Sequence, residues 1–285
     1  MKEVLSPKDL AAAIGVSESS LKRWADKGEV RSTRTPGGHR RIPIAEAIRF
    51  IRAHNVTVVK PELLGLAPEA MREGDNLGDS LYDHLSQGKA QEARALLMTA
   101  FIQGETLAAL FDGPLREALH RLGELWKHDT QGIFVEHRAT DICLEAIREL
   151  RLAVTDDPAN PVAIGGAPSG DGYSIPSLMA GTVLMEESFH AVNLGGNTPL
   201  DSLDAAANEL DARLIWLSIT HPTDEKELDE SLGALGESCR AQRRGLAVGG
   251  QWERTLELAR KHKLHYCESM SALASFARGI RTTID

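Results

Sequence analysis

The stretch Ser6–Ile42, SPKDLAAAIGVSESSLKRWADKGEVRSTRTPGGHRRI, contains start and stop signals for two short helices and a hairpin. Ser6 provides a hydroxyl cap before a proline at the first helical position, where the missing N–H costs nothing. Gly15 ends this helix, and Ser17 caps the next one. The spacing predicts a helix, a tight turn and a second helix, the arrangement that places a helix in the major groove of DNA.

The second helix, expected over residues 18–27, has an apolar side and a basic side. Leu21 and Trp24 point inward, whereas the outward side chains are Ser19, Lys22, Arg23 and Lys27. A tight hairpin is expected next, at Pro36-Gly37-Gly38. Four basic side chains surround its tip: Arg31, Arg34, Arg40 and Arg41. Helix and hairpin together predict contacts with double-stranded DNA.

Two motifs in this stretch resemble the DNA-binding domain of the MerR superfamily. They are G-V-S-x-x-x-L-x-R-W at Gly15–Trp24 and T-x-G-G-H-R-R-I at Thr35–Ile42, and the resemblance covers about the first 70 residues. It implies that four residues lie on or under a recognition helix: Ser19, Lys22, Arg23 and Trp24. It also implies that the wing contains Gly38, His39, Arg40 and Arg41.

Charge is divided unevenly along the 285 residues. Residues 1–60 contain 12 Lys or Arg and 6 Asp or Glu, a net charge of +6, while the whole chain carries −9. Residues 61–285 therefore carry −15. A basic head on an acidic body indicates that only the head contacts nucleic acid, because DNA repels the acidic part.

The composition is that expected of a cytoplasmic protein. No apolar run approaches the ~20 residues of a membrane span, and the first residues do not begin a signal peptide. Three cysteines, Cys143, Cys239 and Cys267, are far apart and follow no metal-ligand spacing. We expect buried thiols in a reducing compartment, no metal site and no membrane partner.

Helical periodicity predicts an antiparallel four-helix bundle over residues 71–157. Apolar residues recur at three- and four-residue steps from Leu77 to Leu152. One long helix is expected over residues 106–127 and another over residues 133–153. Pro and Gly clusters in residues 55–79 predict a linker, with a domain boundary near residue 70.

Beyond Pro161, short apolar strands alternate with helices, which predicts a doubly wound parallel sheet. Ligands bind such sheets at the loops that leave the carboxyl ends of the strands. Those loops are Gly165–Pro176, Gly195–Pro199, Ser218–Pro222 and Gly249–Gln251. The expected fold class is multidomain: a winged helix-turn-helix (1–70), a four-helix bundle (71–157) and a Rossmann-like α/β domain (158–285).

The sheet loops resemble those of the cobalamin-binding domain of methionine synthase and its relatives. The resemblance rests on Asp171, V-N-L-G-G-N-T-P from Val192, L-S-I-T around Ser218, and Gly249-Gly250. Trp126, followed after nine residues by Glu136-His137, resembles the W-x9-E-H pattern of light-sensing repressors of the CarA/CarH/LitR type. In that family the bundle caps cobalamin. The resemblance implies a DNA-binding repressor whose ligand site contains Trp126, Glu136, His137, Asp171, Tyr173, Ser218, Gly249 and Gly250.

The first loop departs from the D-x-H-x-x-G pattern of that family. It reads Asp171-Gly-Tyr173-Ser-Ile-Pro176, so Tyr173 stands at the position of the cobalt-ligating histidine and Pro176 at that of the glycine. A phenol with a pKa of ~10 is a poor ligand near neutral pH. Proline also restricts a backbone that glycine would let pass close to a ligand. We therefore expect that adenosylcobalamin, the cofactor implied by the resemblance, is not bound through a histidine.

Other interpretations stay open from the sequence. The pocket could hold another tetrapyrrole or flat ligand beside Trp126 and His137, or the tail could be a cofactor-free module controlled by a protein antirepressor. His221, at a strand end, is a further candidate ligand. An enzyme is not expected, because Glu136 and His137 are adjacent on a helix and diverge by ~100°. A homo-oligomer is expected through the bundle or the sheet domain, since no long heptad helix follows the head.

Overall fold

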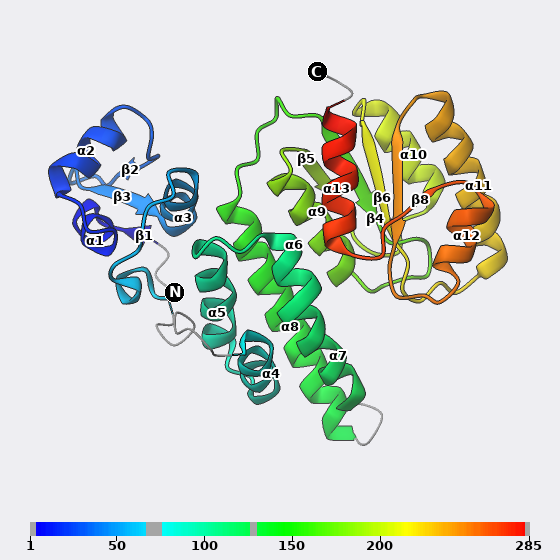
Figure 1. Ribbon diagram of the computed structural model, residues 1–285, viewed down its shortest axis with the longest axis horizontal. Helices are drawn as coiled ribbons and strands as arrows, with labels where there is room; N and C mark the ends of the chain where they lie inside the picture. Colours follow the sequence, from blue (N-terminus) through cyan, green and yellow to red (C-terminus); the bar gives the residue numbers. More distant parts are fainter. Residues whose placement is uncertain (1–3, 67–75, 126–129, 283–285) are drawn as a thin grey trace. The chain divides into compact units, whose positions relative to one another are not determined.

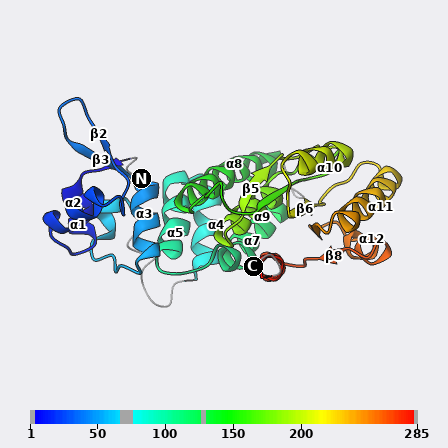
Figure 2. The same ribbon diagram turned by 90° about the horizontal axis from the view of Figure 1, so that it is seen from above.

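The computed structural model describes residues 4–66, 76–125 and 130–282, and the chain divides into two compact units (Figures 1 and 2). The first unit contains residues up to 106 together with 113–154. The second contains residues 107–112 together with 155–285. The break after residue 154 lies close to the domain boundary expected after residue 157. The boundary expected near residue 70 falls outside the described residues and stays a prediction.

The first unit begins with the head that the opening stretch predicts. Its helices are α1 (Pro7–Ala13), α2 (Glu18–Asp26) and α3 (Ile44–Ala53). Its strands β1 (Val4–Leu5), β2 (Thr33–Arg34) and β3 (Arg40–Pro43) form an antiparallel sheet in the order β1-β3-β2. In Figure 2 the hairpin of β2 and β3 extends away from α1 and α2. The winged helix-turn-helix is thus confirmed.

Local hydrogen bonds explain where the first two helices begin. The Ser6 hydroxyl accepts the Asp9 N–H at 3.1 Å while the Asp9 carboxylate accepts the Ser6 N–H, which is a capping box. Ser17 caps α2 by accepting the Ser20 N–H at 3.1 Å. Gly15, with φ of +70°, makes the turn between the helices.

Part of the expected linker belongs to the head. Residues Pro61–Leu64 form a 3-10 turn that packs on α1, and Leu64 is fully buried. The Val59 and Lys60 N–H groups both donate to the Ala13 carbonyl at the end of α1. Apolar burial and these hydrogen bonds extend the head to residue 66, further than the Pro and Gly clusters indicate.

A bundle of four helices follows in the same unit: α4 (Leu77–Gln87), α5 (Ala90–Ile102), α7 (Arg116–Leu125) and α8 (Thr130–Ala153). The long helix expected over residues 106–127 is present from Leu107 to Leu125 but is not a regular α-helix throughout. A short α6 (Leu107–Leu110) leads instead into a π-helical turn, Phe111–Leu115, that contains Pro114. Proline lacks the N–H of a regular helical bond and crowds the preceding turn, so the helix deviates there.

The second unit is a five-stranded parallel sheet in the order β5-β4-β6-β7-β8. The strands are β4 (Val162–Gly166), β5 (His190–Asn193), β6 (Leu214–Ser218), β7 (Gly245–Gly249) and β8 (His265–Tyr266). Contacts place α9 (Ile175–Glu186) and α13 (Met270–Arg281) together, and Figure 1 shows them on the same side of the sheet. The other helices are α10 (Leu200–Glu209), α11 (Glu225–Ala241) and α12 (Thr255–Lys261).

The order of the strands determines where a ligand site can form. Because the chain leaves β4 toward β5 on one side while β6 lies on the other, the topological switch point falls between β4 and β6. The loops after these two strands therefore border the crevice at which ligands bind in such sheets. The doubly wound sheet is confirmed; α12 and α13 are additional helices that were not predicted.

Candidate functional site

Helix α2 presents a polar and basic face to solvent. Ser19, Lys22 and Arg23 are exposed, while Leu21 is completely buried beneath them. The Lys22 ammonium pairs with Glu18 at 2.8 Å on the same face. Trp24 is half-buried, and its ring packs against that of Phe50 on α3 with ring centroids 5.2 Å apart. Trp24 therefore supports α2 from below.

The wing hairpin exposes four of its predicted residues: Arg34, Gly38, His39 and Arg41. Gly38, with φ of +78°, closes the turn, and its N–H donates to the Thr35 carbonyl at 2.8 Å. The exposed guanidiniums and the exposed face of α2 are two basic surfaces of the same small domain. Such a pair of surfaces can contact a groove and the adjacent phosphates.

Arg40 differs from its neighbours in the wing. Only 15% of its side chain is exposed, because the guanidinium pairs with Asp26 and donates to the Lys22 carbonyl at 3.1 Å. Both partners lie on α2. The structure therefore assigns Arg40 a contact between wing and helix, where the sequence predicts a contact with DNA.

Glu46, on α3, fixes the segment between α2 and the wing. Its carboxylate accepts the Arg31 N–H at 2.6 Å and two bonds from the Arg49 guanidinium at 2.8 and 2.5 Å. Burial alone would raise the pKa of Glu46, but the hydrogen bonds from Arg49 and from the Arg31 N–H outweigh burial and lower it. The spacing of Glu46 and Arg49 on one helix is a local signal for their ion pair, whereas nothing local indicates the bond from the Arg31 N–H, 15 residues away.

In the second unit, Asp171 joins the two loops at the switch point. It is fully buried, and its Oδ2 accepts the Thr220 and His221 N–H groups at 2.5 and 2.9 Å. Its Oδ1 accepts the Tyr173 N–H at 3.1 Å. The carboxylate is thus occupied by three backbone donors, and it orders the loops after β4 and β6.

Other predicted residues of the sheet domain gather around these loops. Tyr173 and His221 lie edge to face, with ring centroids 6.4 Å apart, and Ser218 is buried at the end of β6. Gly249 and Gly250 are explained by backbone packing. A Cβ would meet the Cys267 carbonyl oxygen at 2.7 Å from Gly249 and the Ile219 carbonyl oxygen at 2.0 Å from Gly250.

Trp216 is a residue of this region that the sequence analysis does not identify. It lies on β6 two residues before Ser218, is 2% exposed, and its Nε1 donates to the Ser177 hydroxyl at 3.1 Å. Strand alternation places Trp216 on the same face as Ser218, which is the signal that could have identified it. The ring lies on Gly165 of β4, where an added Cβ would approach it to 2.3 Å.

The predicted bundle residues lie on α8 in the first unit. Glu136 accepts a hydrogen bond from Thr140 at 2.9 Å, and exposed His137 places its Nδ1 2.8 Å from the Ile133 carbonyl oxygen. Phe134 is 61% exposed on the same helix. Trp126 falls outside the described residues.

The three cysteines are poor nucleophiles, because a buried thiol loses its proton with difficulty. All three cysteines are free and buried, as expected, and burial raises the pKa of the Cys143, Cys239 and Cys267 thiols to about 12, 11 and 12. No group of three metal-ligating side chains occurs among residues 4–66, 76–125 and 130–282. No helix within these ranges is both long and apolar enough to cross a bilayer.

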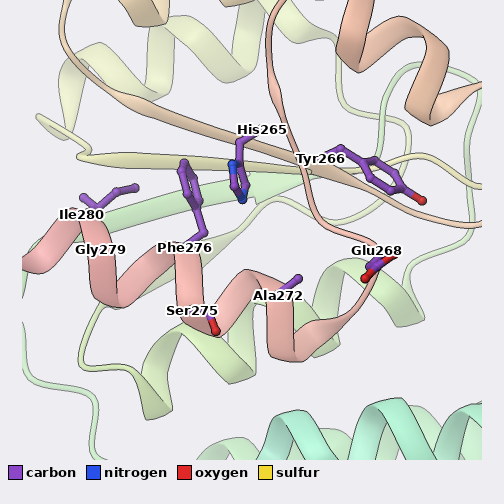
Figure 3. Close-up of a pocket in the computed structure, with 8 residues that line it drawn as sticks. All are labelled: His265, Tyr266, Glu268, Ala272, Ser275, Phe276, Gly279 and Ile280. Carbon is purple, nitrogen blue, oxygen red and sulfur yellow. The ribbon is translucent and has the colours of Figure 1, made fainter.

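A cavity of about 800 Å³ lies between β8 and α13 (Figure 3). His265 and Phe276 stack there with ring centroids 3.9 Å apart, beside Tyr266 and Ile280. Strand β8 is the edge of the sheet two strands away from β6. This cavity is therefore separate from the switch point and contains none of the predicted site residues.

Comparison with known protein families identifies two domains in this chain. The family model of the helix-turn-helix domain matches residues 4–55, and that of the B12 binding domain matches residues 77–151. The HTH-type transcriptional repressor CarA of Myxococcus xanthus is 22% identical over 243 residues, covering 81% of this chain and 82% of that protein. The chain combines a helix-turn-helix domain with a cobalamin-binding-like domain. It is a DNA-binding regulator.

One solved structure supports the fold over 72% of this chain. The monomethylamine corrinoid protein of Methanosarcina barkeri has a TM-score of 0.53 and 15% identity, covering 72% of this chain and 98% of that chain. A cobalamin-binding protein from Desulfitobacterium hafniense has a TM-score of 0.38 and 13% identity, with coverage of 74% and 98%. The similarity to the Methanosarcina barkeri protein shows a shared fold.

Proposed function

We propose that this protein is a transcriptional repressor that binds operator DNA in the cytoplasm and does not hold cobalamin through a histidine. The observation that carries the DNA-binding part is the capped helix α2, whose exposed Ser19, Lys22 and Arg23 accompany an exposed basic wing. The repressor role is supported by the likeness to CarA. Binding as a homo-oligomer, through the bundle or the sheet domain, belongs to the same proposal.

Within this proposal, the DNA-contacting residues are Ser19, Lys22, Arg23, Arg34, Gly38, His39 and Arg41. Trp24 and Arg40 position α2 and the wing. Phosphate contacts release condensed counterions, so affinity falls with salt, and each lost contact reduces the slope of log K against log salt by about one. The acidic body makes no such contact, because its charge repels DNA.

The first loop provides no imidazole at the position where the family resemblance implies a cobalt ligand. Tyr173 stands at the ligand position, and its N–H holds the loop to Asp171. A phenol is a poorer ligand for cobalt than an imidazole, whose neutral form offers a nitrogen lone pair near pH 7. The Asp171 carboxylate instead accepts backbone N–H groups with both of its oxygens and so joins the loops after β4 and β6. Control of repression then passes to another ligand or to a protein partner such as an antirepressor.

Trp126, Glu136 and His137 are the residues of the helical domain that would meet such a ligand. Support for them is the match of the B12 binding domain to residues 77–151 and the exposure of His137 and Phe134 on α8. An amphipathic surface of this kind, with an aromatic ring beside a titratable group, suits a flat and partly polar ligand.

Titration of a fluorescent duplex with the full chain at several salt concentrations tests the DNA-binding part. The duplex pool is first selected with the same protein from random sequences. Arg23→Ala and Arg41→Ala should each weaken binding about tenfold and reduce the salt slope by about one. The matched control is Lys226→Ala, which removes an exposed ammonium from α11 and should change neither quantity. Affinity that is absent or independent of salt would refute the proposal.

A further inference from the structure

The indole of Trp216 lies between the sheet and the start of α9. This residue is paired in register with Gly165 on β4, and the ring covers that glycine so closely that any side chain there would overlap it. The opposite edge of the indole reaches the first turn of α9, where Nε1 donates to the Ser177 hydroxyl at 3.1 Å. The ring is 2% exposed, and its one polar group is satisfied by this hydrogen bond.

The hydrogen bonds continue beyond Ser177 through the neighbouring strand. The Ser177 hydroxyl donates to Asn193 Oδ1 at 2.8 Å, and the Gly195 N–H donates to the same oxygen at 3.1 Å. Trp216, Ser177 and Asn193 therefore connect β6, α9 and the loop after β5. Ser177 is itself completely buried. Each of these polar groups is satisfied within the domain.

The position of this indole is the position at which a ligand would enter. Strands β4 and β6 border the switch point, and both members of the Gly165–Trp216 pair lie one or two residues before the ends of their strands. Above them, Asp171 joins the two following loops. A group inserted between the sheet and α9 would have to displace the ring and break its hydrogen bond to Ser177.

We infer that Trp216 is a built-in occupant of the ligand crevice, so the sheet domain is complete without an inserted cofactor. The inference rests on the proposed function only for the statement that no histidine-ligated cobalamin is held. The Trp216 ring is a second obstacle to cobalamin binding, independent of Tyr173. Once vacated, the crevice would take a flat bicyclic heteroaromatic group with one N–H donor, because Ser177 remains to accept that N–H.

Removal and chemical replacement of the ring test the inference in the full chain. Trp216→Ala should lower the Tm of the sheet domain by roughly 10 °C through loss of a buried aromatic side chain. Millimolar indole or benzimidazole should restore much of that loss, because a dry cavity of matching shape binds an apolar ring. The control is Trp252→Ala, which truncates a tryptophan packed against the core of α10–α12 and should gain nothing from either compound. No rescue of Trp216→Ala, or equal rescue of both variants, would overturn the inference.

A second measurement uses the unaltered protein and does not depend on the folding of a truncated variant. The indole N–H resonance of Trp216, assigned with the milder Trp216→Phe, should exchange with solvent at least tenfold more slowly than those of half-buried Trp24 and Trp252. Hydroxocobalamin should be lost on gel filtration and leave this resonance unmoved. A retained corrinoid together with a shifted Trp216 resonance would show that the ring swings out, which contradicts the inference. Loss of duplex binding would refute only the proposed regulator, since neither readout here involves DNA.

Discussion

Glu46 is a carboxylate buried in the head, and its effect depends entirely on its partners. An uncompensated charge at such a site destabilises a fold, whereas a charge that accepts several short hydrogen bonds stabilises it. Here Arg49 and the Arg31 N–H provide three of these bonds. The Arg49 guanidinium also donates to the Glu29 carbonyl at 3.2 Å, so one ion pair fixes the chain that connects α2 to the wing.

Glu46→Gln should destabilise the first unit by about 1.5–3 kcal/mol at pH 7, because charged hydrogen bonds are lost in a buried site. The pKa of Glu46 is lowered on folding. Its stabilisation is therefore present above the unfolded value of about 4.3 and is lost as the pH falls through the lower folded-state value. Urea unfolding of the two proteins should give free energies that converge at acidic pH. Glu62→Gln, an exposed change in the same unit, should leave the free energy of unfolding unaltered at every pH. A difference that persists below the folded-state pKa would contradict the electrostatic explanation.

At the scale of elements, α2 and the wing work together only if their mutual orientation is fixed. Register pairing fixes Arg34 against Arg40 and Thr33 against Arg41 in the hairpin, and Arg40 then ties the hairpin to α2 through Asp26. Neighbouring arginines thus alternate in direction, as strand geometry requires. Arg41 is left free for a phosphate while Arg40 points back toward the helix.

Arg40→Ala and Asp26→Asn should both weaken duplex binding, by roughly three- to tenfold, if Arg40 acts by positioning the wing. The Asp26 change decides the matter, because it makes the head more positive. If Arg40 contacted phosphate and Asp26 only competed for it, Asp26→Asn would tighten binding. Fluorescence anisotropy at two salt concentrations distinguishes these outcomes. The salt slope should change less for Arg40→Ala than for Arg41→Ala, which removes a phosphate contact.

The elements that could be predicted from sequence are those with local signals. The caps at Ser6 and Ser17 mark the starts of their helices within three residues, and glycines mark the ends of β4 and β7. The π-turn at Pro114 lies inside an uninterrupted apolar period, and that period alone predicts a regular helix. The contact between Arg40 and Asp26 spans 14 residues, and that between Trp216 and Ser177 spans 39. Such contacts are set by tertiary packing, which periodicity and capping do not encode.

At the scale of the whole molecule, the two units do not follow simple consecutive stretches of chain. Residues 107–112 lie in sequence between bundle helices but belong to the sheet unit. Two contacts hold them there. The Leu107 N–H donates to Glu186 on α9 at 2.8 Å, and the Asp112 carboxylate accepts the Met270 and Ser271 N–H groups at 2.7 and 2.9 Å. Asp112 thus neutralises the amino end of α13 from far away in sequence.

This exchange of a segment leads to a calorimetric prediction. Two compact units should unfold in two resolvable transitions, since each has its own core. Asp112→Ala removes an anion and its hydrogen bonds from the start of α13, at a cost of about 1–2 kcal/mol. It should lower the transition of the sheet unit by roughly 3–8 °C and leave the other in place, although residue 112 lies in the helical stretch of the sequence. Glu46→Gln should lower the transition of the first unit instead. Glu230→Ala, an exposed change on α11, should shift neither transition. If Asp112→Ala moved only the transition that Glu46→Gln moves, residues 107–112 would belong energetically to the bundle, and the division of the chain described above would be incorrect.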